Sequence, residues 1–169
     1  MSESRITEAF ASVAETTKES ALNETHEDTL KLAHMRILTG SAGVRMAFDD
    51  VVTHTPRGET FYRYTSEKDL ARADSYLSRT YRNVRDSKKL ERLVISNPRS
   101  GKQKRPRLER FIKYIPEEFD HFDQDIIQIT YGKRIALIDL NVEQAIIVEN
   151  ASLADFQKVI FKMLYRKLS

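Results

Sequence analysis

The chain has 169 residues, of which 40% are hydrophobic and 31% charged, a composition typical of one globular domain with a sizeable core. It contains no cysteine, which excludes disulfides, thiolate catalysis and cysteine-ligated zinc. No apolar run approaches the roughly 20 residues that span a bilayer, and no signal-peptide pattern opens the chain, so we expect a cytoplasmic protein without a membrane partner.

The net charge of +3 hides a strong asymmetry along the chain. Residues 1–30 carry two basic and seven acidic side chains, which leaves a net charge of −5. Residues 79–113 carry thirteen basic and three acidic side chains, which leaves +10. Such asymmetry indicates either an intramolecular charge match or a polyanionic partner.

The first thirty residues predict a helical arm. Ile6, Phe10 and Val13 recur at helical spacing within residues 4–19, but they form only a thin apolar face. Short isolated helices are marginal in water. We therefore expect an arm or linker over residues 1–30 that packs against another protomer or the basic loop, followed by one domain over residues 31–169 that forms a homodimer.

The first part of that domain alternates strands with helices. Strands are expected at residues 32–38, 59–65, 90–96 and 108–115. A helix with Thr39 or Ser41 as its N-cap follows the first strand, and the turn at residues 54–58 ends it. A second helical region over residues 70–84 is expected to break near Asp74 and Ser75.

The last third predicts a meander and a closing helix. Strands at residues 126–131, 134–140 and 145–148 are joined by short turns. Ser152 and Asp155 have the spacing of a capping box at the start of the final helix. That helix has a broad apolar face formed by Leu153, Phe156, Ile160, Met163, Leu164 and Leu168. The whole order predicts an α/β domain in which helices flank a mixed sheet.

Three segments resemble a known family: LTGSAGVRMAFDDVV, ETFYRYTSEKDL, and the stretch from IIQITYGKR to FKMLYRKL. Together they resemble the effector-binding domain of TrmB-type transcriptional regulators, over about residues 35–168. This resemblance implies a phospholipase-D-like half-domain with a regulatory role. Family members normally carry an N-terminal winged helix, which would need about 60 residues with its own core. We therefore expect DNA binding only through a separate winged helix, or weakly through the basic loop.

Enzymes of the phospholipase D fold need a His-x-Lys-x4-Asp motif. The residues two positions after the four histidines are Asp28, Arg36, Pro56 and Asp123. The turn at Gly132 and Lys133 aligns the three motif positions with Gln124, Ile126 and Tyr131. Because this chemistry needs an imidazole nucleophile and a cation for the phosphoryl oxygens, we expect no phosphodiesterase activity.

Candidate binding residues lie where strands end. Ligands of open α/β sheets bind beyond the carboxyl ends of strands, which points to Tyr64, Ser66, Arg110 and Asp139 as effector-binding candidates. The alternatives are sheet packing for the tyrosine and a solvent-facing position for the aspartate. The basic loop, defined by Arg99, Lys102, Lys104, Arg105 and Arg107, is either a polyanion contact or a solvated loop.

Two further patterns favour structural interpretations. Gly40 and Gly43 before a helix could cradle a phosphate, but a strand-to-helix turn explains them as well. The histidines and carboxylates lack metal-ligand spacing, and His121 between Asp120 and Asp123 is their one local cluster. We expect no metal and no cofactor.

Three functions follow from these patterns. We expect the first, a non-catalytic sensor domain of a TrmB-like regulator that binds a small-molecule effector and dimerises. The second is a diverged phospholipase-D-like phosphodiesterase or nuclease, against which the missing His and Lys weigh. The third is a nucleic-acid-associated module that uses the basic loop, and a steep fall of affinity with salt would distinguish it.

Overall fold

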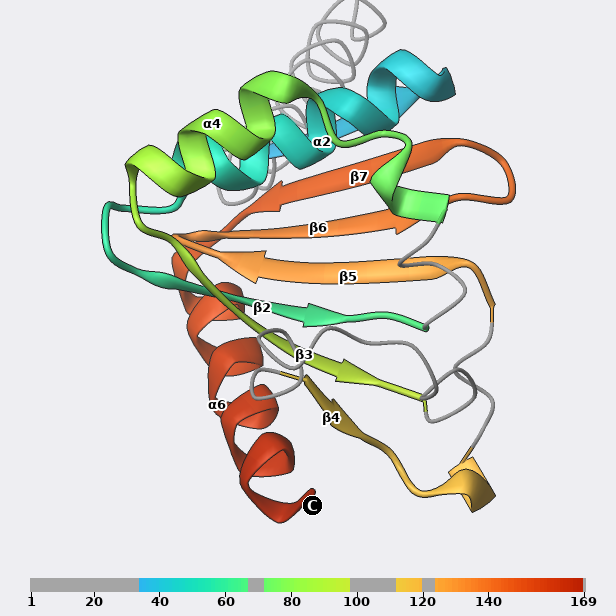
Figure 1. The fold of residues 1–169 in the computed structure, drawn as a ribbon, viewed down its shortest axis with the longest axis vertical. Helices are drawn as coiled ribbons and strands as arrows, with labels where there is room; N and C mark the ends of the chain where they lie inside the picture. Colours follow the sequence, from blue (N-terminus) through green and yellow to red (C-terminus); the bar gives the residue numbers. More distant parts are fainter. Residues whose placement is uncertain (1–33, 67–71, 98–111, 120–123, 169) are drawn as a thin grey trace, which may run out of the picture. The chain divides into compact units, whose positions relative to one another are not determined.

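The computed structural model describes residues 34–66, 72–97, 112–119 and 124–168. Within this part of the chain, seven strands form one mixed sheet in the order β1-β7-β6-β5-β2-β3-β4, and helices cover it (Figure 1). The expected α/β class and mixed sheet are therefore confirmed. The expected arm at residues 1–30, the basic loop and the start of the strand expected at residues 108–115 lie outside the described residues.

The elements follow the predicted order closely. Their bounds are β1 His34–Thr39, α2 Gly40–His54, β2 Thr60–Tyr64, α4 Arg79–Ser87, β3 Glu91–Ser96, β4 Ile112–Tyr114, the 3₁₀ turn η1 Glu117–Phe119, β5 Ile126–Tyr131, β6 Arg134–Asp139, β7 Gln144–Glu149 and α6 Ala151–Lys167. The break expected near Asp74 is present, because residues 72–74 are helical, residues 75–76 form a turn, and α4 begins at residue 79 with Ser78 as its N-cap.

Two halves with different strand directions make up the sheet. β2, β3 and β4 run parallel to one another, whereas β5, β6 and β7 form the predicted antiparallel meander. β5 joins the halves by pairing antiparallel with β2. As a result, the carboxyl ends of β2, β3 and β6 meet the amino end of β5 along one border of the sheet, which we call the strand-end edge.

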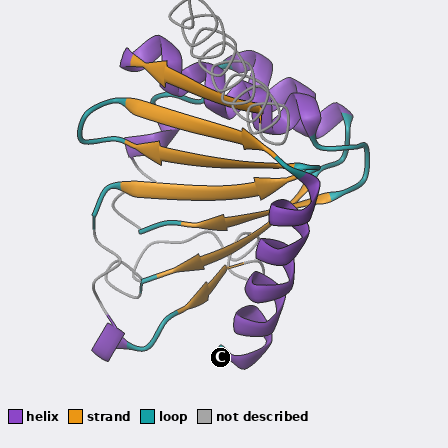
Figure 2. Ribbon diagram, turned by 180° about the vertical axis from the view of Figure 1, so that it is seen from behind, coloured by secondary structure: helices purple, strands orange, loops and turns teal. Residues whose placement is uncertain are grey.

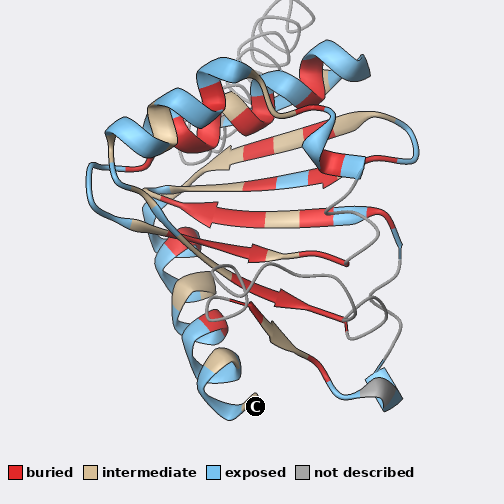
Figure 3. Cartoon of the chain, viewed as in Figure 1, coloured by how far each residue is buried: buried red, intermediate tan, exposed pale blue. Residues whose placement is uncertain are grey.

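Helices lie on both faces of the sheet. α2 and α4 lie on one face, here called the α2 face, and α6 lies on the other, the α6 face (Figures 1 and 2). Successive side chains of a strand point to opposite faces, so Phe61 joins the larger core under α2 while Tyr62 joins a smaller core with Phe161 of α6. The middle of β2 is therefore buried on both sides (Figure 3), whereas β5 and β6 leave Ile126 and Leu137 exposed on the α6 face.

Of the two glycines at the start of α2, Gly43 serves packing, whereas Gly40 has a φ of +71° and open space around it. Thr39 is the N-cap, as expected, although its side chain makes no capping hydrogen bond. A Cβ atom on Gly43 would lie 2.8 Å from the carbonyl carbon of Leu38, so only glycine lets the helix approach β1 this closely. This close approach accounts for Gly43 as part of a strand-to-helix turn.

Two expectations for α6 are wrong. The N-cap is Asn150, whose side chain accepts a hydrogen bond from Leu153 N at 3.0 Å, so the helix begins before Ser152. Most of the expected apolar face is also exposed: Leu168 packs against the smaller core, but the other five residues do not, and the buried residues of the helix are Ala154 and Phe161. Both apolar stripes have helical spacing, and the smaller stripe is the one that meets the sheet.

The turn between β5 and β6 packs tightly against the end of α2. Gly132 has a φ of +47°, and a Cβ atom there would lie 2.5 Å from the carbonyl oxygen of His54. Gly58 has a φ of +75° but open space around its Cα. The two glycines therefore share the left-handed conformation and differ in the room available for a side chain.

We predict that Gly132→Ala is clearly more destabilising than Gly58→Ala. The left-handed conformation costs an alanine about 1–2 kcal/mol at either site, and the forced contact adds about 1–3 kcal/mol at residue 132. Urea unfolding of both variants measures the difference. Equal losses would show that α2 and the β5–β6 turn are not in tight contact.

Candidate functional site

Three of the four effector-binding candidates lie at the strand-end edge. Tyr64 is the last residue of β2 and pairs with Gln128, and Asp139 is the last residue of β6 and pairs with Ile126. Both side chains belong to the α6 face, with β5 between their strands. Ser66 follows β2 and is buried. Arg110 and the basic loop lie outside the described residues.

Tyr64 contributes to sheet packing. Its ring lies 5.0 Å from the ring of Phe161, centroid to centroid, in an edge-on arrangement. Partial burial raises the pKa of its hydroxyl, so the side chain is a neutral phenol at physiological pH. The ring is thus held by α6 while the residue remains only half-buried.

Asp139 is tied into the turn after β6. Its Oδ1 atom accepts hydrogen bonds from the backbone N of Asn141 at 2.8 Å and from Nδ2 of the same residue at 3.1 Å. Asn141 Nδ2 also donates to the carbonyl oxygen of Gln124 at 2.8 Å. The carboxylate therefore organises the loop at the strand-end edge and stays partly exposed.

A group of buried polar residues occupies the same edge, and alternation along β2 and β3 places Arg63, Thr65 and Ser96 of this group on the α2 face. It consists of Arg63, Thr65, Ser66, Ser96 and Asn97, each at most 1% exposed. Arg63 Nη2 donates to Thr65 Oγ1 at 3.3 Å, and its guanidinium lies 5.8 Å from the Phe48 ring centre. Ser96 Oγ is buried without a hydrogen-bond partner among the residues that the structure describes.

The sequence has polar residues after both β2 and β3 that could have predicted this group, but the sequence analysis selected only Ser66 among them. Thr65 and Ser66 follow the apolar run of β2 directly, and Ser96 and Asn97 end and follow β3. Polar pairs at the carboxyl ends of two neighbouring parallel strands must lie close together. The sequence does not show that β2 pairs with β3 or in which register. The sequence analysis therefore did not predict that these residues lie together.

The loop before β5 adds a charged pair to this edge. Asp125 has a φ of +54°, and its Oδ2 atom lies 3.0 Å from Arg72 Nη1. Its carbonyl oxygen accepts a hydrogen bond from Leu140 N at 2.9 Å. The aspartate thereby links the segment after residue 71 to the ends of β5 and β6.

The aligned catalytic positions lie at the two ends of β5. Ile126 begins the strand and is 44% exposed, whereas Tyr131 ends it and is fully buried. The span between them is about 17 Å. Tyr131 donates its hydroxyl hydrogen to Asp50 Oδ2 at 2.7 Å, so the end of β5 is bound to α2.

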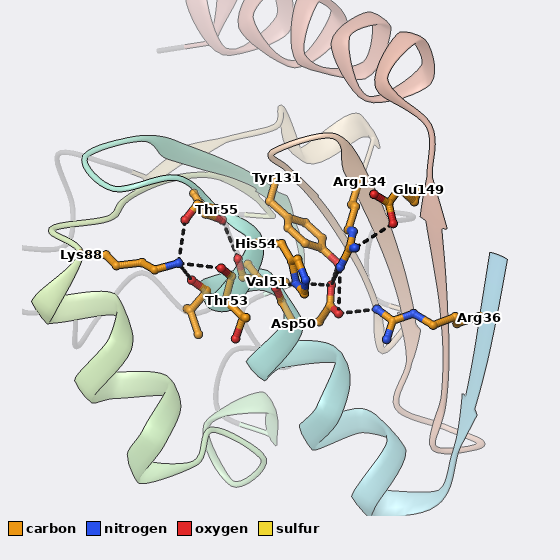
Figure 4. Close-up of polar contacts among 11 residues, drawn as sticks. Arg36, Asp50, Val51, Thr53, His54, Thr55, Lys88, Tyr131, Arg134 and Glu149 are labelled. Atoms are coloured by element: carbon orange, nitrogen blue, oxygen red, sulfur yellow. Dashed lines mark hydrogen bonds and ion pairs between the residues drawn. The ribbon is translucent and has the colours of Figure 1, made fainter. Parts of the chain in front are cut away.

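Asp50 is the centre of a polar network that the sequence analysis missed (Figure 4). Besides Tyr131, its carboxylate accepts hydrogen bonds from Arg134 Nη1, at 3.0 and 3.1 Å, and from Arg36. His54 Nδ1 lies 3.3 Å from Asp50 Oδ2. Asp50 is three residues after Ala47 on the buried stripe of α2, and this spacing could have identified it as a buried charge.

The network controls the ionisation of its members. Burial alone would raise the pKa of Asp50, but hydrogen bonds from Tyr131, Arg36 and Arg134, with the charge of Arg134, hold it below the ordinary value of 3.8. Burial raises the pKa of Tyr131, and the hydrogen bond to Asp50 raises it further. At neutral pH the site therefore pairs a carboxylate with a neutral phenol and arginines.

A second anchor holds the end of α2 beside this network. Lys88 Nζ donates to the carbonyl oxygens of Val52, Thr53 and Thr55 at 2.9, 2.6 and 3.1 Å (Figure 4). A cation at the carboxyl end of a helix satisfies its last carbonyl groups and complements the helix dipole. The network and this anchor have the features of structural sites.

The described residues contain neither a metal-binding cluster nor a membrane-spanning helix. In them, no three or more histidine, aspartate or glutamate side chains are grouped so as to hold a metal ion. The same part of the chain has no helix with the length and apolar character of a membrane span.

No protein-family model matches this chain, and no curated protein matches it in sequence. Solved structures do match. TrmBL2, an archaeal chromatin protein described with a novel mode of DNA binding, aligns over 97% of this chain and 69% of its own, with a TM-score of 0.56 and 11% identity. NucT from Helicobacter pylori aligns over 80% of this chain and 98% of its own, with a TM-score of 0.53 and 10% identity.

A phospholipase D family member, Nuc from Salmonella typhimurium, aligns more weakly, with a TM-score of 0.47 and 8% identity over 81% of this chain and 97% of its own. At such identities a match gives the fold alone. That fold, a mixed α/β sheet covered by helices, is the class expected from the sequence, and it is similar to the folds of TrmBL2 and NucT.

We predict that Asp50→Asn lowers the free energy of unfolding by about 3 kcal/mol at neutral pH, because removing one partner of a buried ion pair leaves the other charges uncompensated. Asp49→Asn is the matched control. Asp49 accepts a hydrogen bond from Ser78 Oγ at 2.7 Å and is only partly buried, so its loss should cost about 1 kcal/mol.

The Asp50 contribution should also depend on pH. Its folded pKa is lowered, whereas the unfolded chain has an aspartate pKa of about 3.9. The unfolded state therefore binds more protons between the two values, and the stabilisation is complete above the unfolded pKa and lost as pH falls through the folded one. The difference in free energy of unfolding between the wild type and Asp50→Asn should therefore decrease below about pH 4. A difference that increases there would contradict the assignment of this carboxylate as a buried, charged hydrogen-bond acceptor.

Proposed function

We propose that the chain is a non-catalytic sensor domain of a TrmB-like transcriptional regulator, which acts in the cytoplasm, binds a small polar effector at the strand-end edge and dimerises. The observation that best supports this function is the buried hydroxyl of Ser96, which lies among polar residues at the carboxyl ends of β2 and β3. Burying polar side chains is costly unless partners satisfy them. A ligand with hydroxyl or carboxyl groups is such a partner.

Ser96 is the most specific support for a ligand here. Its Oγ atom is buried and without a hydrogen-bond partner among the described residues. Thr65 and Asn97 are adjacent to it in register, because Tyr64 pairs with Ile95. Tyr64 and Asp139 approach the same edge from the α6 face, and Arg110 remains a candidate from the chain between β3 and β4.

The missing motif argues against the enzymatic alternative. No histidine in the chain has a lysine two residues later, and the aligned positions hold glutamine, isoleucine and tyrosine. The tyrosine at the last position has its hydroxyl committed to Asp50. The scaffold is therefore compatible with a phosphodiesterase, whereas the side chains at the aligned positions favour a binding role.

DNA contact through the basic loop is the second candidate. The similarity in fold to TrmBL2, described as a DNA-binding chromatin protein, favours it. Five phosphate contacts predict a loss of affinity of about several hundredfold between 50 and 200 mM salt. Binding that is absent, or insensitive to salt, would exclude this role.

We predict that a thermal-shift screen of sugars, organic acids and nucleotides finds a ligand that raises the unfolding midpoint, because binding to the native state stabilises it. Ser96→Ala should raise the dissociation constant of that ligand by roughly two- to tenfold, which corresponds to the loss of one hydrogen bond. Ser87→Ala is the control, since Ser87 is exposed at the end of α4. Equal affinity in the two variants would contradict a site at the strand-end edge.

A further inference from the structure

The outer surface of α6 is unusually apolar. Six large hydrophobic side chains on this helix are exposed, namely Leu153, Phe156, Val159, Ile160, Met163 and Leu164. Phe156 and Met163 are 61% and 62% exposed, so they are not rim residues of the core. In Figure 3 most of α6 is coloured as exposed.

These side chains form one stripe. Phe156, Ile160 and Met163 have the i, i+4, i+7 spacing of a single helix face. Ala154 and Phe161, which face the sheet, lie on a different side of the helix. Asp155, Lys162 and Arg166 follow one another at helical spacing along one flank of the stripe, whereas Lys167 lies at the carboxyl end of the stripe itself.

The stripe continues onto the sheet. Gln157 Oε1 accepts a hydrogen bond from Gln128 Nε2 at 3.2 Å, which places that side of α6 beside β5. On the same face, Ile126 and Leu137 are 44% and 39% exposed. Monomeric proteins rarely expose contiguous apolar patches of more than a few hundred Å², so this surface, which we call the α6 stripe, calls for a partner.

We propose that the partner is a second copy of this chain, bound through an antiparallel pair of α6 helices around a two-fold axis near Ile160. In an isologous dimer the same surface contacts itself. The stripe is centred near Ile160. In the dimer, Phe156 of each copy would therefore lie opposite Met163 and Leu164 of the other copy. Aromatic and methionine side chains pack favourably in such contacts.

The charges on the flank favour this arrangement. Across an antiparallel pair, the same flank of each helix meets its counterpart. Asp155 near the start of one helix then lies opposite Arg166 near the end of the other. The Asp155 side chain is 73% exposed in the monomer, where it pairs with Lys158 of its own helix at 3.0 Å. A parallel pair would set this charged flank against the apolar one.

This inference assigns a surface to the dimer in the proposed function and does not depend on effector binding. A dimer without an effector would support the surface alone, whereas an effector bound by a monomer would overturn the surface and leave the sensor role intact. The arm at residues 1–30 is the competing dimerisation element, and the experiment distinguishes the two.

The test is sedimentation equilibrium of the full chain at tens of micromolar. Ile160→Glu should raise the dimer dissociation constant by about tenfold or more, because the carboxylate would be buried at the two-fold axis. Val142→Glu is the control, since Val142 is 66% exposed in the turn after β6 and lies outside the stripe. A monomeric wild type, or a dimer that Ile160→Glu leaves unchanged, would overturn the proposal.

Charge-reversal variants test the same pairing with changes at exposed residues, which should leave the fold intact. Asp155→Lys and Arg166→Glu are surface changes that should each weaken the dimer by placing like charges together. The double variant should restore the wild-type dissociation constant, because the pair is reversed and complementary again. Two single variants that weaken the dimer without restoration in the double variant would overturn the antiparallel pairing, as would single variants without effect.

Discussion

The carboxylate of Asp50 joins helix α2 to the sheet, and the arrangement of the domain depends on this contact. It is almost wholly buried, and it accepts hydrogen bonds from the end of β5, from β6 and from β1. A buried charge without such partners would strongly destabilise the fold. The network therefore fixes α2 against the meander at one position, and the glycine at residue 132 is needed because that position leaves no room for a side chain.

This arrangement gives the two ends of β5 different roles. The carboxyl end, at Tyr131, is committed to holding α2. The amino end, at Ile126, belongs to the strand-end edge, where buried hydroxyl and amide groups follow β2 and β3.

The sequence predicted the order of elements because each local pattern was strong. The meander over residues 126–149 alternates in a way that only a strand pattern explains, and the turn at Gly132 separates its first two strands. The choice of face on α6 was wrong because that helix has apolar residues on two sides. Periodicity identifies such stripes but does not say that the one with Phe161, rather than Phe156, meets the sheet.

The site was predictable only in part for a similar reason. The rule that ligands bind beyond strand ends led to Tyr64, Ser66 and Asp139, each at the end of its own strand. The neighbouring group with Ser96 requires the pairing of β2 with β3, and Asp50 requires contacts with a hairpin some eighty residues later in the chain. Contacts that distant in sequence are set by tertiary packing, which no local pattern contains.

Hydrolysis of a generic phosphodiester, bis-p-nitrophenyl phosphate, by the purified full chain tests the central claim most directly, namely that the scaffold recognises a ligand without catalysing a reaction. The account predicts a rate no greater than that of buffer, because neither an imidazole nucleophile nor a cation occupies the aligned positions. Turnover by the wild type that disappears in Gln124→Ala or Tyr131→Phe would contradict it.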